Sequence, residues 1–238
     1  MTDQKLSGHS IIEANRTRNE SSDQDDALGG AGVKAKLQSL DREPIRINAL
    51  KEGFPAIEID LSWDRPEYKA NNFLSLAKSA VTKEKADLDL GCLYELKDGQ
   101  KGCLQAFGEL YGSYDTAPYI QHSGDERTGE SEGADESLTI NGAHWNDIKR
   151  VLVYAYIYQG VENWNLIRSE CMLRVGSHET VRLSLEAKKE VLPICALMTL
   201  ENEDGHIVIT RRAEYFRGHP ALDRAYGYGI EWTKGEKA

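Results

Sequence analysis

The chain has 238 residues, a formal net charge of −10, 40% hydrophobic residues and 29% charged residues. That length allows one large all-β domain or two small ones, with enough residues for a real core. The acidic balance argues against nucleic acid as the main partner, because neutralising phosphates needs a basic face. No apolar run is long enough for a transmembrane helix, and Met1–Lys5 lacks the apolar core of a secretion signal, so we expect a cytoplasmic protein.

The first part of the chain, residues 1–43, is polar, contains a glycine-rich stretch at 29–32 and shows no sustained periodicity. A segment of this composition cannot bury enough apolar surface to offset the entropy lost on ordering. We therefore predict a disordered N-terminal tail over residues 1–43, with at most a short helix around Val33–Leu40. The folded domain is expected to occupy residues 44–238.

Two strands are predicted directly after the tail, at Arg46–Asn48 and Ala56–Trp63. The second alternates strictly between apolar and polar side chains, which indicates a strand with one buried face. Residues 64–85 then change to helical spacing, and Pro66 suits a first helical turn. We expect a short amphipathic helical insertion there, either packed on a sheet edge or facing a partner or a membrane surface.

The segment Asp87–Leu96 is predicted to be a strand that opens with two acids. Asp87 and Asp89 are two residues apart, so a strand directs both side chains to one face and the intervening leucines to the other. Two carboxylates at the start of a strand are unfavourable in a core but suitable for a metal ion. An Asp-Gly turn then leads to a partner strand at Lys101–Phe107, which completes a hairpin.

An acidic loop, Gly124–Glu136, contains six carboxylates, three glycines, one arginine and one threonine. Glycines allow the sharp turns that fold such a loop around an ion, and oxygen ligands of this kind suit Ca²⁺ before Mg²⁺. Residues 87–136 hold twelve acids against three bases, a local charge of −9, so most of the chain's imbalance lies there. This concentration favours a cation site, and the alternative is a solvated acidic loop without a ligand.

The remaining chain alternates short apolar runs with turn signals. The strongest run, Val151–Tyr158, is hydrophobic on both faces and is expected to be a central strand. Further strands are predicted at Leu138–Ile140, Cys171–Val175, Val181–Leu185, Ile194–Leu200 and Ile207–Tyr215, with a short helix at His219–Tyr226. About ten short strands separated by turns predict an all-β fold, an antiparallel β-sandwich.

Several of these segments resemble the tellurium-resistance TerD family. The resemblance rests on an Asp-Leu-Asp-Leu strand paired with the Gly124–Glu136 loop, and the flanking text is closer to the TerA-type branch: Gly91–Leu96, Ile140–Trp145, Arg150–Tyr158 and Tyr215–Pro220. It covers residue 45 to the C-terminus. It implies a calcium-binding β-sandwich linked to tellurite, phage and general stress phenotypes. Ser131 and Ala134 stand where the family usually has a glycine and an acid, which lowers the charge of one ion site.

The resemblance and the acidic segments together predict a Ca²⁺ site, with room for two ions. Its expected ligands are Asp87, Asp89, Asp125, Thr128, Glu130, Glu132, Asp135 and Glu136. The function we expect is a calcium-binding stress-response module that is not an enzyme. Its partners would be calcium ions and other proteins of the same resistance system, with membrane-surface association as a further option. The alternative is a metal-dependent hydrolase or a redox enzyme acting on tellurium oxyanions.

Cysteine and histidine bear on that alternative. The four cysteines lie in predicted strands and form no C-x-x-C pair, so a zinc site is not indicated and each thiol is expected to be buried: Cys92, Cys103, Cys171 and Cys195. The alternative to four inert buried thiols is a reactive thiol that captures tellurite or its reduced forms. His122 is the histidine closest to the acidic loop, and we expect a hydrogen-bonded neighbour rather than a catalytic base. The sequence has no nucleophile elbow and no P-loop.

Overall fold

The computed structural model describes residues 33–34, 43–64, 87–124, 134–159, 164, 167–176, 178–185 and 192–232. Three predictions fall mainly outside these ranges: the helix at 64–85, most of the N-terminal tail, and residues 125–133 of the acidic loop. Of the tail, the structure describes Val33–Lys34 and Glu43, and Val33–Lys34 form a short strand, β1, rather than the start of a helix.

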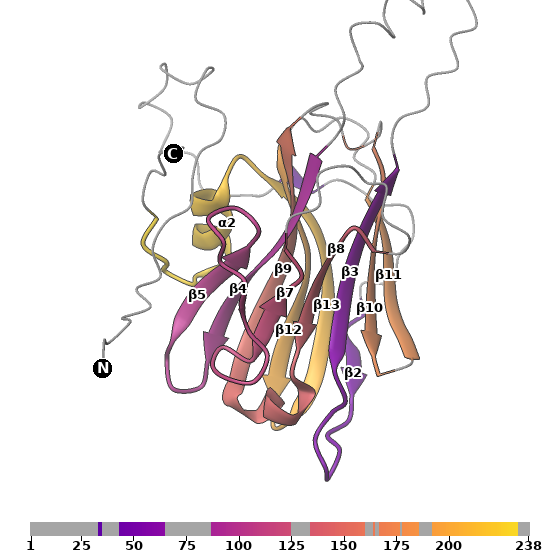
Figure 1. The fold of residues 1–238 in the computed structure, drawn as a ribbon, viewed down its shortest axis with the longest axis vertical. Coiled ribbons are helices and arrows are strands. Elements are labelled where there is room, and N and C mark those ends of the chain that lie inside the picture. Colours follow the sequence, from indigo (N-terminus) through magenta and orange to yellow (C-terminus); the bar gives the residue numbers. More distant parts are fainter. Residues whose placement is uncertain are drawn as a thin grey trace, which may run out of the picture.

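The described strands form two antiparallel sheets (Figure 1). Sheet I has the order β1-β13-β12-β9-β4-β5, and β2 also pairs with β13. Its strands are β1 (Val33–Lys34), β2 (Ile45–Ile47), β4 (Asp87–Leu96), β5 (Lys101–Gln105), β9 (Ile148–Gln159), β12 (Ile194–Glu203) and β13 (His206–Phe216).

Sheet II has the order β11-β10-β3-β8-β7-β6. Its strands are β3 (Ile57–Asp64), β6 (Gly112–Ser113), β7 (Ile120–His122), β8 (Glu136–Ile140), β10 (Arg168–Val175) and β11 (His178–Leu185). A 3-10 helix, η1 (Gly142–Asp147), precedes β9, and the helix α2 (His219–Tyr226) follows β13.

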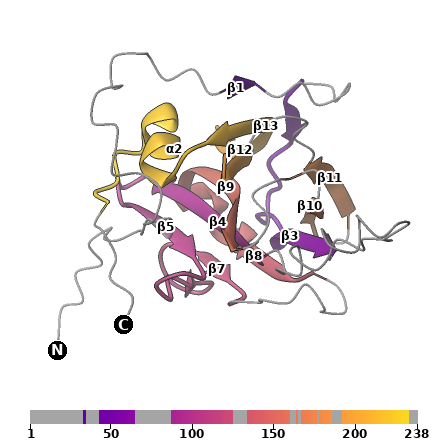
Figure 2. The same ribbon diagram turned by 90° about the horizontal axis from the view of Figure 1, so that it is seen from above.

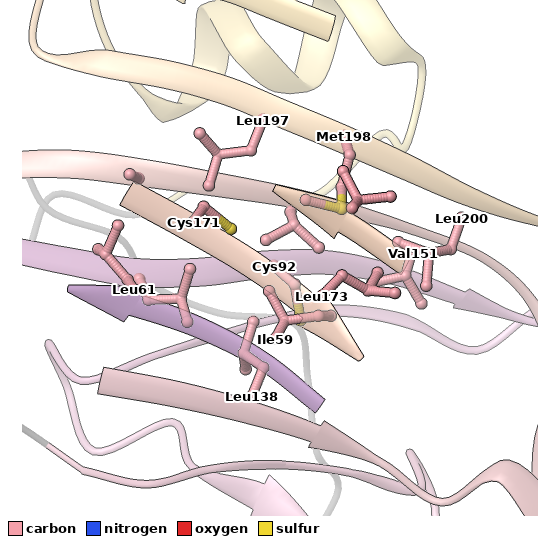
Figure 3. Close-up of a cluster of buried hydrophobic side chains, with 14 of the residues drawn as sticks. Ile59, Leu61, Cys92, Leu138, Val151, Cys171, Leu173, Leu197, Met198 and Leu200 are labelled. Atoms are coloured by element: carbon pink, nitrogen blue, oxygen red, sulfur yellow. The ribbon is translucent and has the colours of Figure 1, made fainter. Parts of the chain in front are cut away.

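The main core lies between the two sheets, which confirms the predicted antiparallel sandwich. Apolar side chains from both sheets meet there and are almost fully buried (Figure 3): Ile59, Leu138 and Leu173 from sheet II, and Cys92, Val151 and Leu200 from sheet I. Alternation explains the arrangement, because every second residue of β3 enters this core.

A second, smaller cluster covers the outer face of sheet I. It joins Leu152, Tyr154 and Tyr156 of β9 to residues of α2 and the segment after it, including Leu222 and Tyr228. Figure 2 shows α2 against sheet I, on the side away from β3. The strand β9 lies between β12 and β4 and is buried on both faces, as its double-sided apolar pattern predicts.

The outer face of sheet II is polar instead. Arg174 on β10 forms ion pairs with Glu58 and Asp60 on β3, and Arg182 pairs with Glu170. No helix among the described residues combines the length and the apolar character that crossing a bilayer requires.

Candidate metal centre

Four strand ends meet beside the acidic loop. The chain leaves β7, passes through the loop and enters β8, and β8 pairs with the end of β3 through Leu61 and Glu136. The start of β4 lies next to this junction, because the backbone N–H of Leu90 donates a 2.6 Å hydrogen bond to Glu136 Oε2. The predicted acidic strand and the predicted acidic loop are therefore at the same end of the sandwich.

The two ends of the loop are tied to each other. The backbone N–H of Ser123 donates to the carbonyl of Ser137 at 2.9 Å, and the N–H of Ser137 donates to Ser123 Oγ at 2.9 Å. One residue further on, the N–H of Gly124 donates to His122 Nδ1 at 3.0 Å. We call these residues, 122–124 and 135–137, the neck of the loop.

Asp135 fixes the neck to sheet II. Its backbone N–H donates to the carbonyl of Leu61 at 3.0 Å, and its Oδ2 accepts the N–H of Trp63 at 2.8 Å. A carboxylate thus continues the hydrogen bonding of β3 beyond the point where β8 begins.

Glu136 and His122 fix the neck to sheet I. Glu136 Oε2 accepts the N–H of Leu90, and His122 Nε2 lies 2.8 Å from the carbonyl oxygen of the same residue. Because His122 Nδ1 accepts the N–H of Gly124, the imidazole is the neutral tautomer with its proton on Nε2, and that proton is donated to Leu90. Both side chains are 0% exposed, and their nearest polar atoms are 3.5 Å apart.

Asp87 and Asp89 lie on the other side of β4. Leu88 and Leu90 enter the core, so the two aspartates face away from it, as the alternation predicts. Asp89 pairs with Tyr156 across the ladder, which places it on the outer face of sheet I. Asp87 is 7% exposed and Asp89 5% exposed.

Asp89 also acts on its neighbour Tyr154. Burial raises the pKa of the Tyr154 phenol well above its ordinary value, and the thiol of Cys103 and the charge of Asp89 raise it further. The phenol is therefore a neutral hydrogen-bond donor, and it donates to Gln105 Oε1 at 2.9 Å.

The structure brings Asp135 and Glu136 to the neck and Asp87 and Asp89 to β4. Among the residues with described positions, no group of three or more His, Cys, Asp or Glu side chains is arranged to hold a metal ion. The other predicted ligands, Asp125, Thr128, Glu130 and Glu132, lie outside the described ranges. The ligand set therefore stays a prediction, and its all-oxygen donors fit a hard cation such as Ca²⁺.

All four cysteines are buried and free. Burial raises the pKa of Cys103 and of Cys195 to about 12, and it also raises the pKa values of Cys92 and Cys171. Because the thiolate is the reactive form, these thiols are poor nucleophiles and poor metal ligands near neutral pH.

Sequence reasoning missed most of the neck. Ser123, Ser137 and Trp63 carried no signal, because their roles depend on which strands become neighbours. His122 was singled out for its position beside the acidic loop, and the structure shows a hydrogen-bonded neighbour, as predicted.

The sequence is 38% identical over 206 residues to the tellurium resistance protein TerA of Alcaligenes sp., a match that covers 86% of this chain. The chain is a TerA-type member of the tellurium-resistance family. It spans 60% of the length of that relative. No family model matches the chain.

Two crystal structures share the fold. One is a homologue of the telluride resistance protein TerD from Streptomyces coelicolor A3(2), with a TM-score of 0.52, 16% identity, and coverage of 75% of this chain and 100% of that one. The other is SAV2460, described as a protein of unknown function, with a TM-score of 0.52, 15% identity, and coverage of 75% and 99%. The family assignment from sequence and the sandwich described above therefore agree.

Proposed function

We propose that this chain is a calcium-binding module of the tellurium-resistance type, and that it acts in the cytoplasm without catalysis, through other proteins of the same system. The observation that carries the proposal is the neck. It anchors both ends of the acidic loop beside the strand that holds Asp87 and Asp89, through a 2.6 Å hydrogen bond between the Leu90 N–H and Glu136. The acidic loop thus leaves and re-enters the sandwich next to the end of β4 that carries Asp87 and Asp89.

The ion would be held by carboxylates of β4, the neck and the loop. The proposed ligands are Asp87, Asp89 and Asp135, completed by Asp125, Thr128, Glu130 and Glu132. Calcium is favoured over magnesium because it accepts six to eight oxygens in flexible geometry, whereas Mg²⁺ demands a strict octahedron and releases its waters reluctantly. The bound ion would offset the repulsion among these carboxylates.

A catalytic role has less support. Redox chemistry on tellurium oxyanions through a thiol needs an accessible thiolate, and all four cysteines are buried with raised pKa values. We therefore expect the quadruple Cys→Ser variant, provided that it folds, to protect cells against tellurite as the wild type does. Loss of protection in a folded variant would favour the thiol mechanism.

Equilibrium dialysis of the full chain against Ca²⁺ tests the proposal directly. We expect bound Ca²⁺ at millimolar concentration, and weaker binding in Asp89→Asn and Asp125→Asn. Glu52→Gln is the matched control, because it removes one charge from an exposed turn before β3, at the opposite end of that strand from the neck. No bound Ca²⁺ at millimolar concentration would rule the site out. Affinity capture of partners with and without a chelator then tests whether the ion controls assembly.

A further inference from the structure

The edge of β4 is open at Leu90. β5 pairs with β4 from Gly91, opposite Gln105, to Glu95, opposite Lys101. On its other side Leu90 pairs with Ala155 of β9. At Leu90 the β5 side of the strand therefore lacks a neighbouring strand in that ladder, and an unpaired backbone N–H or C=O at a buried position is costly.

Two side chains from sheet II take the place of that strand. Glu136 accepts the N–H of Leu90, and the Nε2–H of His122 donates to its carbonyl oxygen. The backbone N–H and C=O of Leu90 are thus both hydrogen-bonded, the N–H by a carboxylate from β8 and the C=O by an imidazole from β7. The pair also bridges the two sheets at the place where the acidic loop leaves and returns.

We infer that Glu136 and His122 are positioning residues that clamp the neck of the acidic loop to the open edge of β4, and that Glu136 is not a calcium ligand. The statement about the ligand rests on the calcium proposal, whereas the clamp itself does not. It revises the ligand set expected from the sequence motif, in which Glu136 is the last acid of the loop.

The environment of Glu136 supports a clamp over a ligand. A calcium ion needs six to eight oxygens at about 2.3–2.6 Å, some of them usually from water. The Glu136 side chain is 0% exposed, its Oε2 is already bonded to Leu90 at 2.6 Å, and a neutral imidazole lies 3.5 Å away. Asp87 and Asp89, in contrast, project from the opposite side of β4.

The clamp has a consequence for ion binding. The neck is held by Ser123, Ser137 and Asp135 as well as by the clamp, and none of these hydrogen bonds involves an ion. Protein groups alone therefore hold the two ends of the loop, so we expect the same hydrogen bonds at the neck with and without a bound ion.

Nitrogen NMR of the imidazole tests the clamp without calcium. In uniformly ¹⁵N-labelled full-length protein with a chelator, His122 should show the Nε2–H tautomer, and the Leu90 amide should exchange slowly with solvent. We expect the same tautomer after Ca²⁺ is added. An Nδ1–H tautomer or a rapidly exchanging Leu90 amide in the wild type would overturn the clamp.

Substitution at Glu136 separates a clamp from a ligand. Glu136→Gln keeps an oxygen acceptor for Leu90 but loses the charge, so calorimetric titration should give a Ca²⁺ dissociation constant within about threefold of the wild type. Asp125→Asn, the loop variant, should weaken binding about tenfold or more, on the scale seen when a metal site loses a coordinating or supporting group. Glu136→Ala should speed exchange at Leu90, and Glu136→Gln should restore slow exchange.

The two proposals fail in different ways. If Glu136→Gln weakens Ca²⁺ binding as much as Asp125→Asn, Glu136 is a ligand and this inference is wrong while the calcium proposal stands. If the wild type binds no Ca²⁺, the calcium proposal is wrong, and the tautomer and the Leu90 amide still decide the clamp. Should Glu136→Ala not fold, the wild type and the Gln variant give the same decision.

Discussion

At the scale of single residues, packing on the outer face of sheet I keeps the His219 imidazole neutral. Its ring packs against Tyr154, Tyr156 and Trp232, with centroids 5.3, 5.3 and 5.5 Å away. The side chain is buried, its Nε2 has no hydrogen-bond partner among the described residues, and burial lowers its pKa from 6.5 to about 3. The neutral imidazole therefore packs among aromatic rings, between the start of α2 and sheet I.

Lowering the pH should reduce the free energy of unfolding, because the buried His219 resists protonation. His219→Phe should remove the part of this pH dependence that comes from His219. A histidine with a lowered folded pKa supports stability above pH 6.5, and that support is lost as the pH falls toward about 3. At pH 5, about 1.5 pH units below the ordinary pKa, the loss is about 2 kcal/mol. Urea unfolding at pH 7 and pH 5 measures it. Equal pH dependence in wild type and variant would contradict the assignment, and His144→Gln, at an exposed imidazole, is the control.

Glu95 is a second residue whose charge matters. Burial alone would raise its pKa, but hydrogen bonds from Lys149 and Arg150 outweigh burial and lower it. Arg150 also donates to the carbonyls of Tyr226 and Gly227, so the ion pair orients the side chain that holds the end of α2.

Glu95→Gln should lower the free energy of unfolding at pH 7 by about 1–2 kcal/mol, because it weakens charge-assisted hydrogen bonds. A carboxylate with a lowered folded pKa supplies stability above its ordinary value of 4.5, and that stability disappears as the pH falls through the folded pKa. The difference between variant and wild type should therefore shrink below about pH 4. Glu203→Gln, in an exposed pair with Arg46, should change stability by less than about 1 kcal/mol.

At the scale of elements, β4 depends on a glycine. A Cβ at Gly91 would lie 2.4 Å from Cζ of Tyr154, which packs over this position from β9. The ring cannot easily move, because its hydroxyl bonds to Gln105 and contacts the Cys103 sulfur at 3.2 Å. Glycine here admits a buried aromatic ring between the two strands.

Gly91→Ala should therefore destabilise the protein by about 1–3 kcal/mol, the usual cost of overpacking a core. Gly218→Ala is the comparison, since its nearest neighbouring atom would be 3.8 Å from the new Cβ and its φ of −179° suits any residue. That variant should cost less than about 1 kcal/mol. Thermal unfolding of both variants measures the difference, and equal stability would show that the Tyr154 ring can shift without cost.

Local sequence patterns predicted where an element begins and ends better than they predicted which strands pair. The bounds of β4 and α2 match the prediction, because alternation and the Pro220 signal are local. β7 was missed, since three residues carry too little pattern and the strand exists through pairing with β8. The strand β8 begins two residues earlier than predicted, at Glu136, because Glu136 pairs with Leu61 of β3, and its carboxylate accepts the Leu90 N–H at the open edge of β4. Such an edge depends on where β5 ends, which is a non-local property.

At the scale of the whole molecule, negative charge is concentrated in one segment of the chain, whose acids include Asp87 and Asp89 at the start of β4 and Asp135 and Glu136 at the neck. Residues 87–136 carry −9 of the net −10. Elsewhere acids are matched by bases, as in the pairs of Arg174 with Glu58 and Asp60 on sheet II. In the metal-free protein the concentrated carboxylates repel, so a cation bound there should stabilise the whole fold.

Millimolar Ca²⁺ should therefore raise the melting temperature, and Mg²⁺ should raise it less. A ligand at a hundredfold excess over its dissociation constant adds about 2.7 kcal/mol, which corresponds to a rise of about 5–10 °C in a domain of this size. Asp125→Asn should reduce the Ca²⁺ shift and raise the melting temperature of the metal-free protein, because one repelling charge is gone. Glu52→Gln removes the same charge from an exposed turn and should leave the shift unchanged. Equal shifts with the two cations, or a Glu52→Gln variant that behaves like Asp125→Asn, would show that the effect is general screening rather than a localised calcium site.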